Sequence, residues 1–394
     1  RAMSPVLPQD DAVSRRWFLD RMAWVSSVAA AGAVLPTSAA GLGRERHGPD
    51  TTRALRSLED AYVRPGVQQD PTEMTLVETV ALVRRGTVRP EEMAEAHADR
   101  IERYDGVLKA YAARPTRDAL TAEATRTPSR GPDALLRGAC LAPKDNFYTA
   151  DMLTEGGSRV YRGFQPDYDA TVVATMRAEG GLMVGKAQMG NLAGGRAQVY
   201  GTTTPTTRNA WTPDGDRYSP GGSSSGTATA VAARLAVAGL GTQTGGSVIG
   251  PGNLQGLTCI KPTFGRVSLH GVIPLSYTRD HVGSMARDAL DAALLLQVIA
   301  HPDANDPRTL GLPPVPDFVR AATPFPGDRP AVRWPTRIGM LPGYLETDNE
   351  RVNELRSTLV EELVSRGAVT MVGEVRLRDQ WEERTSPPLG GSHG

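Results

Sequence analysis

Two stretches in the first third of the chain repeat their apolar residues every three or four positions, which is the period of a helix with one buried face. In the first stretch, Thr75 and Glu78 match a capping box, and Gly86 is a stop signal. Its apolar face consists of Leu76, Val80 and Val83. The second stretch runs from about residue 90 to residue 104. The pattern therefore predicts a pair of helices in this part of the chain.

Farther along, short apolar runs alternate with helical patterns. Strands are expected at residues 138–143, 182–184 and 236–240. Asp169 is expected to cap a helix that runs through Met176, and the turn at 222–225 is expected to open an Ala-rich helix. This alternation predicts an α/β fold, with a mixed central sheet flanked by helices on both faces. Ligand sites in such sheets gather at strand ends.

The last quarter of the chain has a different pattern. Proline is dense from residue 301 to residue 335, which indicates an irregular connector. A strand is expected at 337–341, followed by a helix capped by Asp348 or Asn349 and a strand at 369–372. We interpret the apolar stripe of that helix as core; it consists of Val352, Leu355, Leu359 and Leu363.

The first forty residues carry a targeting pattern. Residues 14–20 read Ser-Arg-Arg-Trp-Phe-Leu-Asp and resemble a twin-arginine export motif. A modest apolar stretch follows at 22–35, and small residues that suit cleavage follow at 36–40. A membrane anchor is the alternative, but the stretch is short and interrupted by serines. We therefore expect a signal peptide at 1–40, export by the twin-arginine machinery, no stable membrane anchor, and a periplasmic or extracellular protein.

Composition excludes several classes of function. Lysine plus arginine equals aspartate plus glutamate at 44 each, so nothing indicates a nucleic-acid partner or an anionic membrane. Six histidines without a His-x-x-x-His pair, and two distant cysteines, argue against a metal site, and no cofactor is expected. Cys140 and Cys259 lie in apolar, strand-like contexts that favour buried free thiols over a disulfide. Nothing indicates the oligomeric state.

Residues 219–262 carry the strongest chemical signal. Ser223 and Ser247 each follow a Gly-Gly pair, and Lys144 lies upstream at the end of a predicted strand. A serine on a glycine turn, a second hydroxyl and a lysine can form an activated nucleophile. No histidine lies near either serine, so lysine is the natural base. Lowering a lysine pKa from about 10.4 to about 7 takes roughly 4–5 kcal/mol, which burial in a dry pocket can supply.

Each of these patterns also has a simpler explanation. The run Gly-Gly-Ser-Ser-Ser-Gly is more often a flexible linker, although a small-residue helix pattern follows it here. Lys144 alone would usually be a solvated surface charge. Gly239, Gly241 and Gly245 follow a predicted strand and suggest a dinucleotide loop. Their spacing differs from Gly-x-Gly-x-x-Gly, and no clear acidic partner follows about twenty residues later.

In their order along the chain, these blocks resemble the amidase-signature family of serine hydrolases. The matching segments are Lys144–Asn146, Gly185–Lys186 with Asn191, Pro220–Ser224, Gly241–Ser247, Lys261–Thr263, Gly265–Ser268 and Gly283–Met285. Several ordered blocks are far more specific than one Gly-rich motif. The resemblance implies an amidohydrolase that cleaves a carboxamide C–N bond through an acyl-enzyme, with a small-molecule or peptide amide as substrate.

The resemblance also implies a role for each site residue. Ser247 would attack the amide carbonyl, and Ser223, joined to Gly222 by a cis peptide bond, would relay a proton between Ser247 and Lys144. Ser224 would steady this relay by hydrogen bonding. The oxyanion hole would consist of the backbone N–H groups of Thr244, Gly245, Gly246 and Ser247.

Four residues depart from the commonest pattern of the family. Gln243 stands where an acidic residue is usual, and Ile249 stands where an arginine is usual. Gly252 and Asn253 replace a run of small residues of the Ala/Ser type. Because the first two changes remove charge beside the nucleophile turn, we expect a differently braced loop and a neutral acyl pocket.

The resemblance covers roughly residues 72–300. We assign a polar, loosely ordered segment to 41–71 and a single domain to 72–394, with the catalytic core at about 135–290. Because family members usually continue for a hundred or more residues, the chain is expected to be truncated at its C-terminal end. An inactive amidase-like protein and an esterase with the same triad are the alternatives. Some family members transfer ammonia to charged tRNA, a role that the predicted export disfavours.

Overall fold

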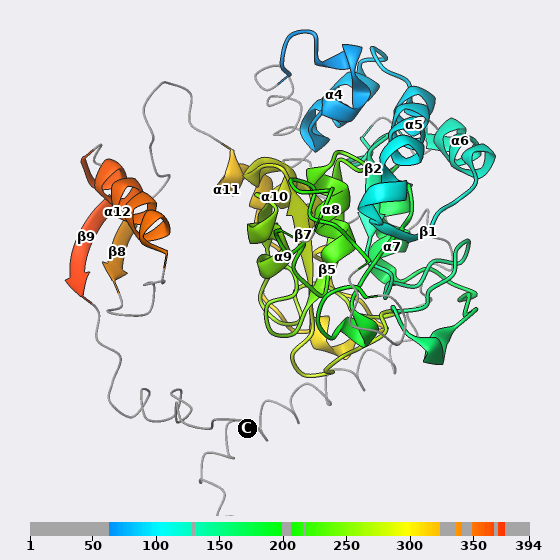
Figure 1. Ribbon diagram of the computed structural model, residues 1–394. Coiled ribbons are helices and arrows are strands. Elements are labelled where there is room, and N and C mark those ends of the chain that lie inside the picture. Colours follow the sequence, from blue (N-terminus) through cyan, green and yellow to red (C-terminus); the bar gives the residue numbers. More distant parts are fainter. Residues whose placement is uncertain are drawn as a thin grey trace, which may run out of the picture. The chain divides into compact units, whose positions relative to one another are not determined.

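The computed structural model describes residues 63–127, 131, 133–198, 206–215, 217–323, 336–340, 349–365 and 369–374. The predicted signal peptide lies outside these residues, as does most of the 41–71 segment. The chain divides into two compact units, and the first of them ends at Ala322 (Figure 1). The sequence predicts one domain over 72–394 instead. The division falls within the predicted proline-rich connector at 301–335.

A five-stranded mixed sheet forms the centre of the first unit. In spatial order its strands are β3 (Leu182–Met183), β2 (Cys140–Pro143), β5 (Ala238–Gln243), β7 (His281–Ala286) and β6 (Thr258–Ile260). β2 is parallel to β3 and β5, whereas β7 is antiparallel to β5 and β6. β1 (Tyr111–Ala113) and β4 (Lys186–Ala187) form a separate antiparallel pair. Because β2 and β5 are buried along their whole length, they contain apolar and small residues without alternation.

Helices surround this sheet, some packed on it and others on neighbouring helices (Figure 1). They are α4 (Leu76–Arg84), α5 (Pro90–Leu108), α6 (Arg117–Arg126), α7 (Thr171–Ala178), α8 (Ser225–Ala232), α9 (Ile249–Leu254), α10 (Ala289–Ile299) and α11 (Phe318–Ala322). Single turns of 3-10 helix occur at Val67–Gln69, Pro71–Glu73, Arg159–Tyr161, Asn191–Ala193 and Pro307–Thr309. The predicted α/β alternation is therefore present.

Neighbouring residues of β7 show that helices lie on both faces of the sheet. Met285 packs in one hydrophobic cluster with Ala228 of α8. The hydroxyl of the preceding residue, Ser284, donates to the Ala292 carbonyl of α10 at 2.8 Å. Successive side chains of a strand point to opposite faces. It follows that α8 and α10 cover opposite faces, as the sequence predicts.

The first two helices begin where the sequence predicts. The N–H of Glu78 donates to Thr75 Oγ1 at 3.2 Å, and the N–H of Thr75 donates to Glu78 Oε2 at 2.9 Å, which completes the capping box of α4. α5 continues past its predicted end at residue 104. Its last residue, Leu108, is still buried, and Lys109, in the left-handed region with φ of 53°, ends the helix.

The prediction that Asp169 caps the next helix is wrong. α7 is preceded by Ala170, whose side chain makes no capping bond. The Asp169 carboxylate instead accepts from Ala150 N–H at 2.9 Å and lies 3.2 Å from Arg177 Nε. These partners come from a preceding loop and from the far end of the helix, so they cannot be seen in the residues next to Asp169.

The second unit contains a β-α-β arrangement of β8 (Thr336–Met340), α12 (Glu350–Ser365) and β9 (Val369–Glu374). The two strands are parallel. The N–H of Val352 donates to Asn349 Oδ1 at 3.2 Å, so Asn349, one of the two predicted caps, caps the helix; Asp348 lies outside the described residues. The prediction that the helix stripe is core is wrong, because three of its side chains are largely exposed: Val352 (41%), Leu355 (54%) and Leu359 (57%).

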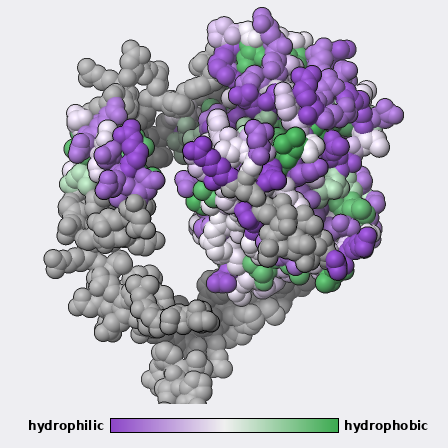
Figure 2. Space-filling model, viewed as in Figure 1, coloured by the Kyte–Doolittle hydropathy of each residue, from purple (hydrophilic) through white to green (hydrophobic). Residues whose placement is uncertain are grey.

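The visible surface of the first unit is mostly hydrophilic, with hydrophobic residues in small separate areas (Figure 2). In the part of the chain that the structure describes, no helix has the length and apolar character required to cross a membrane. Cys140 and Cys259 are free thiols, and burial raises the pKa of both, that of Cys259 to about 12.

Candidate active site

Lys144 lies directly after β2 and is fully buried. Its backbone N–H donates to the Leu240 carbonyl at 2.9 Å, which continues the pairing of β2 with β5 by one residue. Its Nζ lies 2.7 Å from Ser223 Oγ. The sheet therefore places the predicted base in contact with the predicted relay serine.

The other partners of the Lys144 amine are neutral oxygens of β5. Its Nζ lies 2.9 Å from Thr242 Oγ1 and 3.3 Å from the Thr242 carbonyl oxygen. Asn146 Nδ2 donates to the same Thr242 hydroxyl at 3.0 Å. Burial lowers the pKa of Lys144 to about 7, and the negative charge of Asp280 opposes this effect. An amine with this pKa is substantially neutral near pH 7, as the proposed chemistry requires.

Ser223 is held in a tightly packed turn at the start of α8. The Gly222–Ser223 peptide bond is cis, which is the geometry that the resemblance implies. A Cβ at Gly222 would lie 2.3 Å from the Gly195 carbonyl oxygen, so only glycine fits there. Ser223 is fully buried, and its carbonyl accepts from Gly190 N–H at 3.1 Å. The hydroxyl is thus fixed beside the Lys144 amine.

Ser247 lies in the turn between β5 and α9 and is partly buried. Its carbonyl accepts from Ser224 N–H at 3.3 Å, so the two serine-bearing turns are in backbone contact. Ser224 Oγ also lies 3.5 Å from the Thr242 carbonyl oxygen. The structure therefore brings the turns of both serines and the lysine to the same end of β2 and β5.

The backbone of the Ser247 turn offers open hydrogen-bond donors. Gly245 and Gly246 are exposed, and a Cβ at either would meet nothing within 4 Å. Among the described residues, no hydrogen bond occupies the N–H groups of positions 245–247. Thr244, the first predicted oxyanion-hole residue, is fixed because its hydroxyl donates to the Asp280 carboxylate. Such free N–H groups next to a serine can bind a developing oxyanion.

Two residues in contact with the candidate site were not assigned a role from the sequence. Thr242 lies within a quoted motif, but its contact with the lysine depends on the pairing of β2 with β5. Asp280 gives no local signal. Its carboxylate accepts from the Thr244 hydroxyl and from the N–H groups of Leu275 and Ser276 at 2.8 and 2.9 Å. It ties the loop before β7 to the Ser247 turn.

A second buried lysine, Lys186, differs from Lys144 in its partners. Its Nζ lies 3.3 Å from the buried Asp145 carboxylate and 2.6 Å from Thr154 Oγ1. Burial lowers the pKa of Lys186, and Asp145 opposes the shift. Lys144 has no carboxylate among its hydrogen-bond partners in the described chain, so it is the better candidate for a neutral amine.

The four residues that depart from the family pattern lie in or next to the Ser247 turn. The Gln243 side chain bonds to the backbone of this turn and so braces the loop; a difference from relatives with an acidic residue here stays a prediction. Gly252 has a separate explanation. A Cβ at this position would lie 2.1 Å from Cys259 Sγ, so glycine here accommodates a cysteine on β6. Nothing in the structure explains Asn253.

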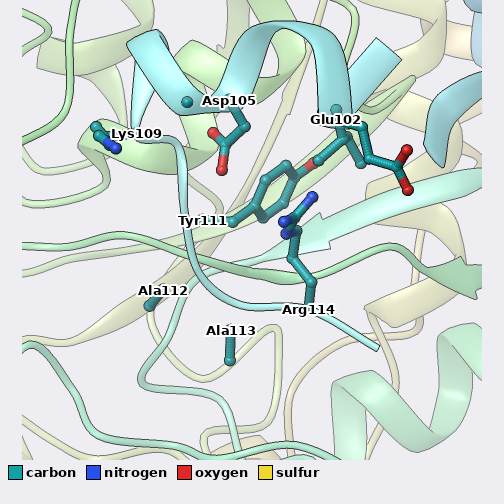
Figure 3. A pocket seen from close by; sticks show the side chains of 9 residues that line it. Glu102, Asp105, Lys109, Tyr111, Ala112, Ala113 and Arg114 are labelled. Carbon is teal, nitrogen blue, oxygen red and sulfur yellow. The ribbon is translucent and has the colours of Figure 1, made fainter. Parts of the chain in front are cut away.

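A surface pocket of about 380 Å³ lies elsewhere, at the end of α5 and along β1 (Figure 3). Glu102, Asp105 and Arg114 line it, and none of the predicted catalytic residues does. The Tyr111 hydroxyl at this pocket donates to the Leu235 carbonyl at 3.1 Å. In the described residues, no group of histidine, cysteine or acidic side chains could hold a metal ion.

The chain is similar to known proteins in sequence and in fold. The amidase family profile matches residues 92–379. The chain is 41% identical over 263 residues to the putative amidase AmiD of Mycobacterium tuberculosis (strain ATCC 25618 / H37Rv). The matched region covers 66% of this chain and 54% of AmiD. It is 41% identical over 250 residues to a subunit of glutamyl-tRNA(Gln) amidotransferase from Myxococcus xanthus (strain DK1622), covering 63% of this chain and 50% of that one. It therefore spans about half the length of these relatives.

Solved structures show the same fold. The peptide amidase from Stenotrophomonas maltophilia is 30% identical with a TM-score of 0.66, and the match covers 81% of this chain and 64% of that one. An amidase family protein from Bacillus anthracis str. Ames is 24% identical with a TM-score of 0.66, covering 85% of this chain and 68% of that one. The predicted α/β fold is thus confirmed, and the chain belongs to the amidase family.

Proposed function

We propose that this protein hydrolyses a carboxamide C–N bond through an acyl-enzyme formed on Ser247. The observation that carries the proposal is the 2.7 Å contact between Ser223 Oγ and a fully buried Lys144 amine. No carboxylate bonds this amine within the described residues, and burial lowers its pKa to about 7. A lysine in this state can accept a proton from a serine hydroxyl.

The contacts of Lys144 suggest the direction in which the proton moves. A neutral amine has two N–H donors and one lone pair. The hydroxyl and carbonyl oxygens of Thr242 can accept from the two donors, at 2.9 and 3.3 Å. This leaves the lone pair for the Ser223 hydroxyl. Ser223 can then accept the Ser247 proton while it gives its own proton to Lys144.

The remaining steps follow from this relay. Ser247 Oγ bonds to the amide carbon, and the carbonyl oxygen gains negative charge next to the open N–H groups of residues 245–247. Lys144 returns the proton through Ser223 to the leaving nitrogen as the C–N bond breaks. Water then attacks the acyl-enzyme by the same proton route and releases the acid.

The relatives support an amide substrate. One of them bears the name of a peptide amidase, and others are named as an amidase or as part of an amidotransferase. We propose a small-molecule or peptide amide for this chain. We also propose that residues 1–40 direct export by the twin-arginine route, on the basis of the motif at 14–20.

Labelling by a fluorophosphonate tests the nucleophile without knowledge of the substrate. The peptide that contains Ser247 should gain the mass of the phosphonyl group, and Ser247→Ala should abolish this gain. Ser284→Ala is a matched control, because Ser284 is a buried serine of the same sheet whose hydroxyl donates to Ala292. If the folded wild-type protein is not labelled, the inactive alternative is correct.

An esterase with the same triad is the second candidate, because an ester is easier to cleave than an amide. Paired amide and ester substrates with one acyl group separate the two. Hydrolysis of the ester alone would overturn the amidase proposal.

A further inference from the structure

The side chain of Gln243 makes three hydrogen bonds within the turn that carries Ser247. Its Oε1 accepts from the N–H groups of Val248 and Ile249, both at 2.9 Å. Its Nε2 donates to the carbonyl oxygen of Gly245 at 3.2 Å. Gln243 is the last residue of β5 and is buried, so this side chain connects the central sheet to the turn.

The bond to the Gly245 carbonyl also determines the direction of the next N–H group. The Gly245 C=O and the Gly246 N–H belong to one planar trans peptide unit and point in opposite directions. Because the buried Gln243 side chain holds the Gly245 carbonyl, the Gly246 N–H points away from Gln243. No hydrogen bond in the described chain occupies that N–H, and the space beside Gly246 is open.

The same side chain removes two other donors of the turn from use. The N–H groups of Val248 and Ile249 donate to Gln243, so they are not available to an oxyanion. The N–H groups of residues 245–247 remain available. Gln243 thus separates the donors that hold the loop from those that can meet a ligand.

We propose that Gln243 is a positioning residue of the oxyanion hole. Its amide N–H fixes the Gly245–Gly246 peptide unit so that the Gly246 N–H points to the site where negative charge develops. The role rests on the function proposed above, because the oxyanion lies at this turn only if Ser247 is the nucleophile. It goes beyond that function by naming the side chain that orients the donors.

An amide side chain is suited to this task. It accepts two hydrogen bonds through its oxygen and donates through its nitrogen, whereas a carboxylate only accepts. The Gln243 side chain therefore braces the turn through both its oxygen and its nitrogen.

The test uses two variants of Gln243 in the full chain. Gln243→Glu keeps the acceptor for Val248 and Ile249 but loses the donor to Gly245. Gln243→Met keeps the length and loses all three bonds. Gln297→Glu is the control, because Gln297 is a buried glutamine of α10 whose Oε1 accepts from Phe318 N–H at 2.7 Å, outside the turn.

The measurement is the rate of inactivation by a fluorophosphonate. Ser247 Oγ forms a bond to phosphorus, fluoride leaves, and the hydroxyl proton passes through Ser223 to Lys144. The phosphonyl oxygen gains negative charge where an amide oxygen would. The rate is measured against probe concentration and pH, which separates the limiting rate from the affinity for the probe. Circular dichroism and thermal unfolding give the folded fraction of each variant, and each rate is divided by that fraction.

We expect the limiting rate at the high-pH plateau to fall about tenfold to a hundredfold in Gln243→Glu and further in Gln243→Met, because one oxyanion donor is worth about 10²–10³ in rate. The affinity for the probe should change little, and Gln297→Glu should match the wild type. A wild-type limiting rate in folded Gln243→Glu would overturn the proposal. If the wild type is not labelled at all, the nucleophile itself is wrong, and the role of Gln243 is lost with it.

Discussion

Replacement of Lys144 by methionine should abolish labelling of Ser247. It should also raise the free energy of unfolding relative to the wild type, and this gain should be larger at pH 7 than at pH 9. Burial holds the pKa of Lys144 at about 7 in the folded protein, against an ordinary value of about 10.4 in the unfolded chain. Between these values the unfolded chain binds a proton that the folded protein does not bind. Stability therefore rises with pH across this window.

The size of the effect follows from the two pKa values. Below about pH 7 the buried amine costs roughly 4–5 kcal/mol of stability, because the shift is about three units at about 1.4 kcal/mol per unit. The cost is about 4 kcal/mol at pH 7, about 2 kcal/mol at pH 9, and close to zero by pH 11. Methionine has a similar length and no charge, so Lys144→Met removes this pH-dependent cost. Its lost hydrogen bonds to Ser223 and Thr242 add a contribution that does not vary with pH.

Urea denaturation at pH 7, 8 and 9 gives the free energy of unfolding of both proteins. The stability of Lys144→Met relative to the wild type should decrease by about 2 kcal/mol from pH 7 to pH 9. The exposed Lys261 provides the control variant Lys261→Met, which removes one positive charge from the surface. A difference between Lys144→Met and the wild type that stays constant over this range would show that the amine is not held neutral, and the proposed relay would fail.

Three further changes test other contacts. Lys186→Met should lower the free energy of unfolding by about 3–5 kcal/mol, because it leaves the buried Asp145 carboxylate without its lysine partner. Urea denaturation at neutral pH measures this loss, and an unchanged free energy of unfolding would contradict the prediction. Thr242→Val removes a hydroxyl that accepts from the proposed base and should slow fluorophosphonate labelling about tenfold, or about 1.4 kcal/mol; a wild-type rate would exclude this role. Gly252→Ala should cost about 1–3 kcal/mol, because the new Cβ collides with Cys259 Sγ. The double variant with Cys259→Ala should recover part of that loss in thermal unfolding, and strictly additive effects would argue against the collision.

The features that the sequence predicts correctly are those set by neighbouring residues. The capping box of α4 needs only Thr75 and Glu78, which are three positions apart. The strand before Lys144 is visible because β2 is buried on both faces and is therefore continuously apolar. The glycine turns around the two serines likewise carry their own signal. The expectation that the lysine and both serine turns share one site comes instead from the resemblance to the amidase-signature family.

The features that the sequence does not predict depend on contacts between distant segments. β5 extends to Gln243 because His281 of β7 pairs with it, and the residues of β5 alone do not show this. Asp169 does not cap α7, because Ala150 and Arg177 take up its carboxylate. A residue pattern gives the propensity to form an element, but the partners that fix its ends and its polar contacts come from elsewhere in the fold.

The state of Lys144 depends on the side chain that follows it in the sequence. Asp145 is the nearest acidic residue along the chain, and a pair between the two would hold the amine in its charged form. The Asp145 carboxylate instead lies 3.3 Å from Lys186 Nζ, and its other oxygen accepts from Glu155 N–H at 3.2 Å. Lys144 is left with hydroxyl and carbonyl partners, and burial then favours the neutral amine. In this way the buried pair of Asp145 with Lys186 contributes to the proposed chemistry, because it removes the counterion that would otherwise keep the base protonated.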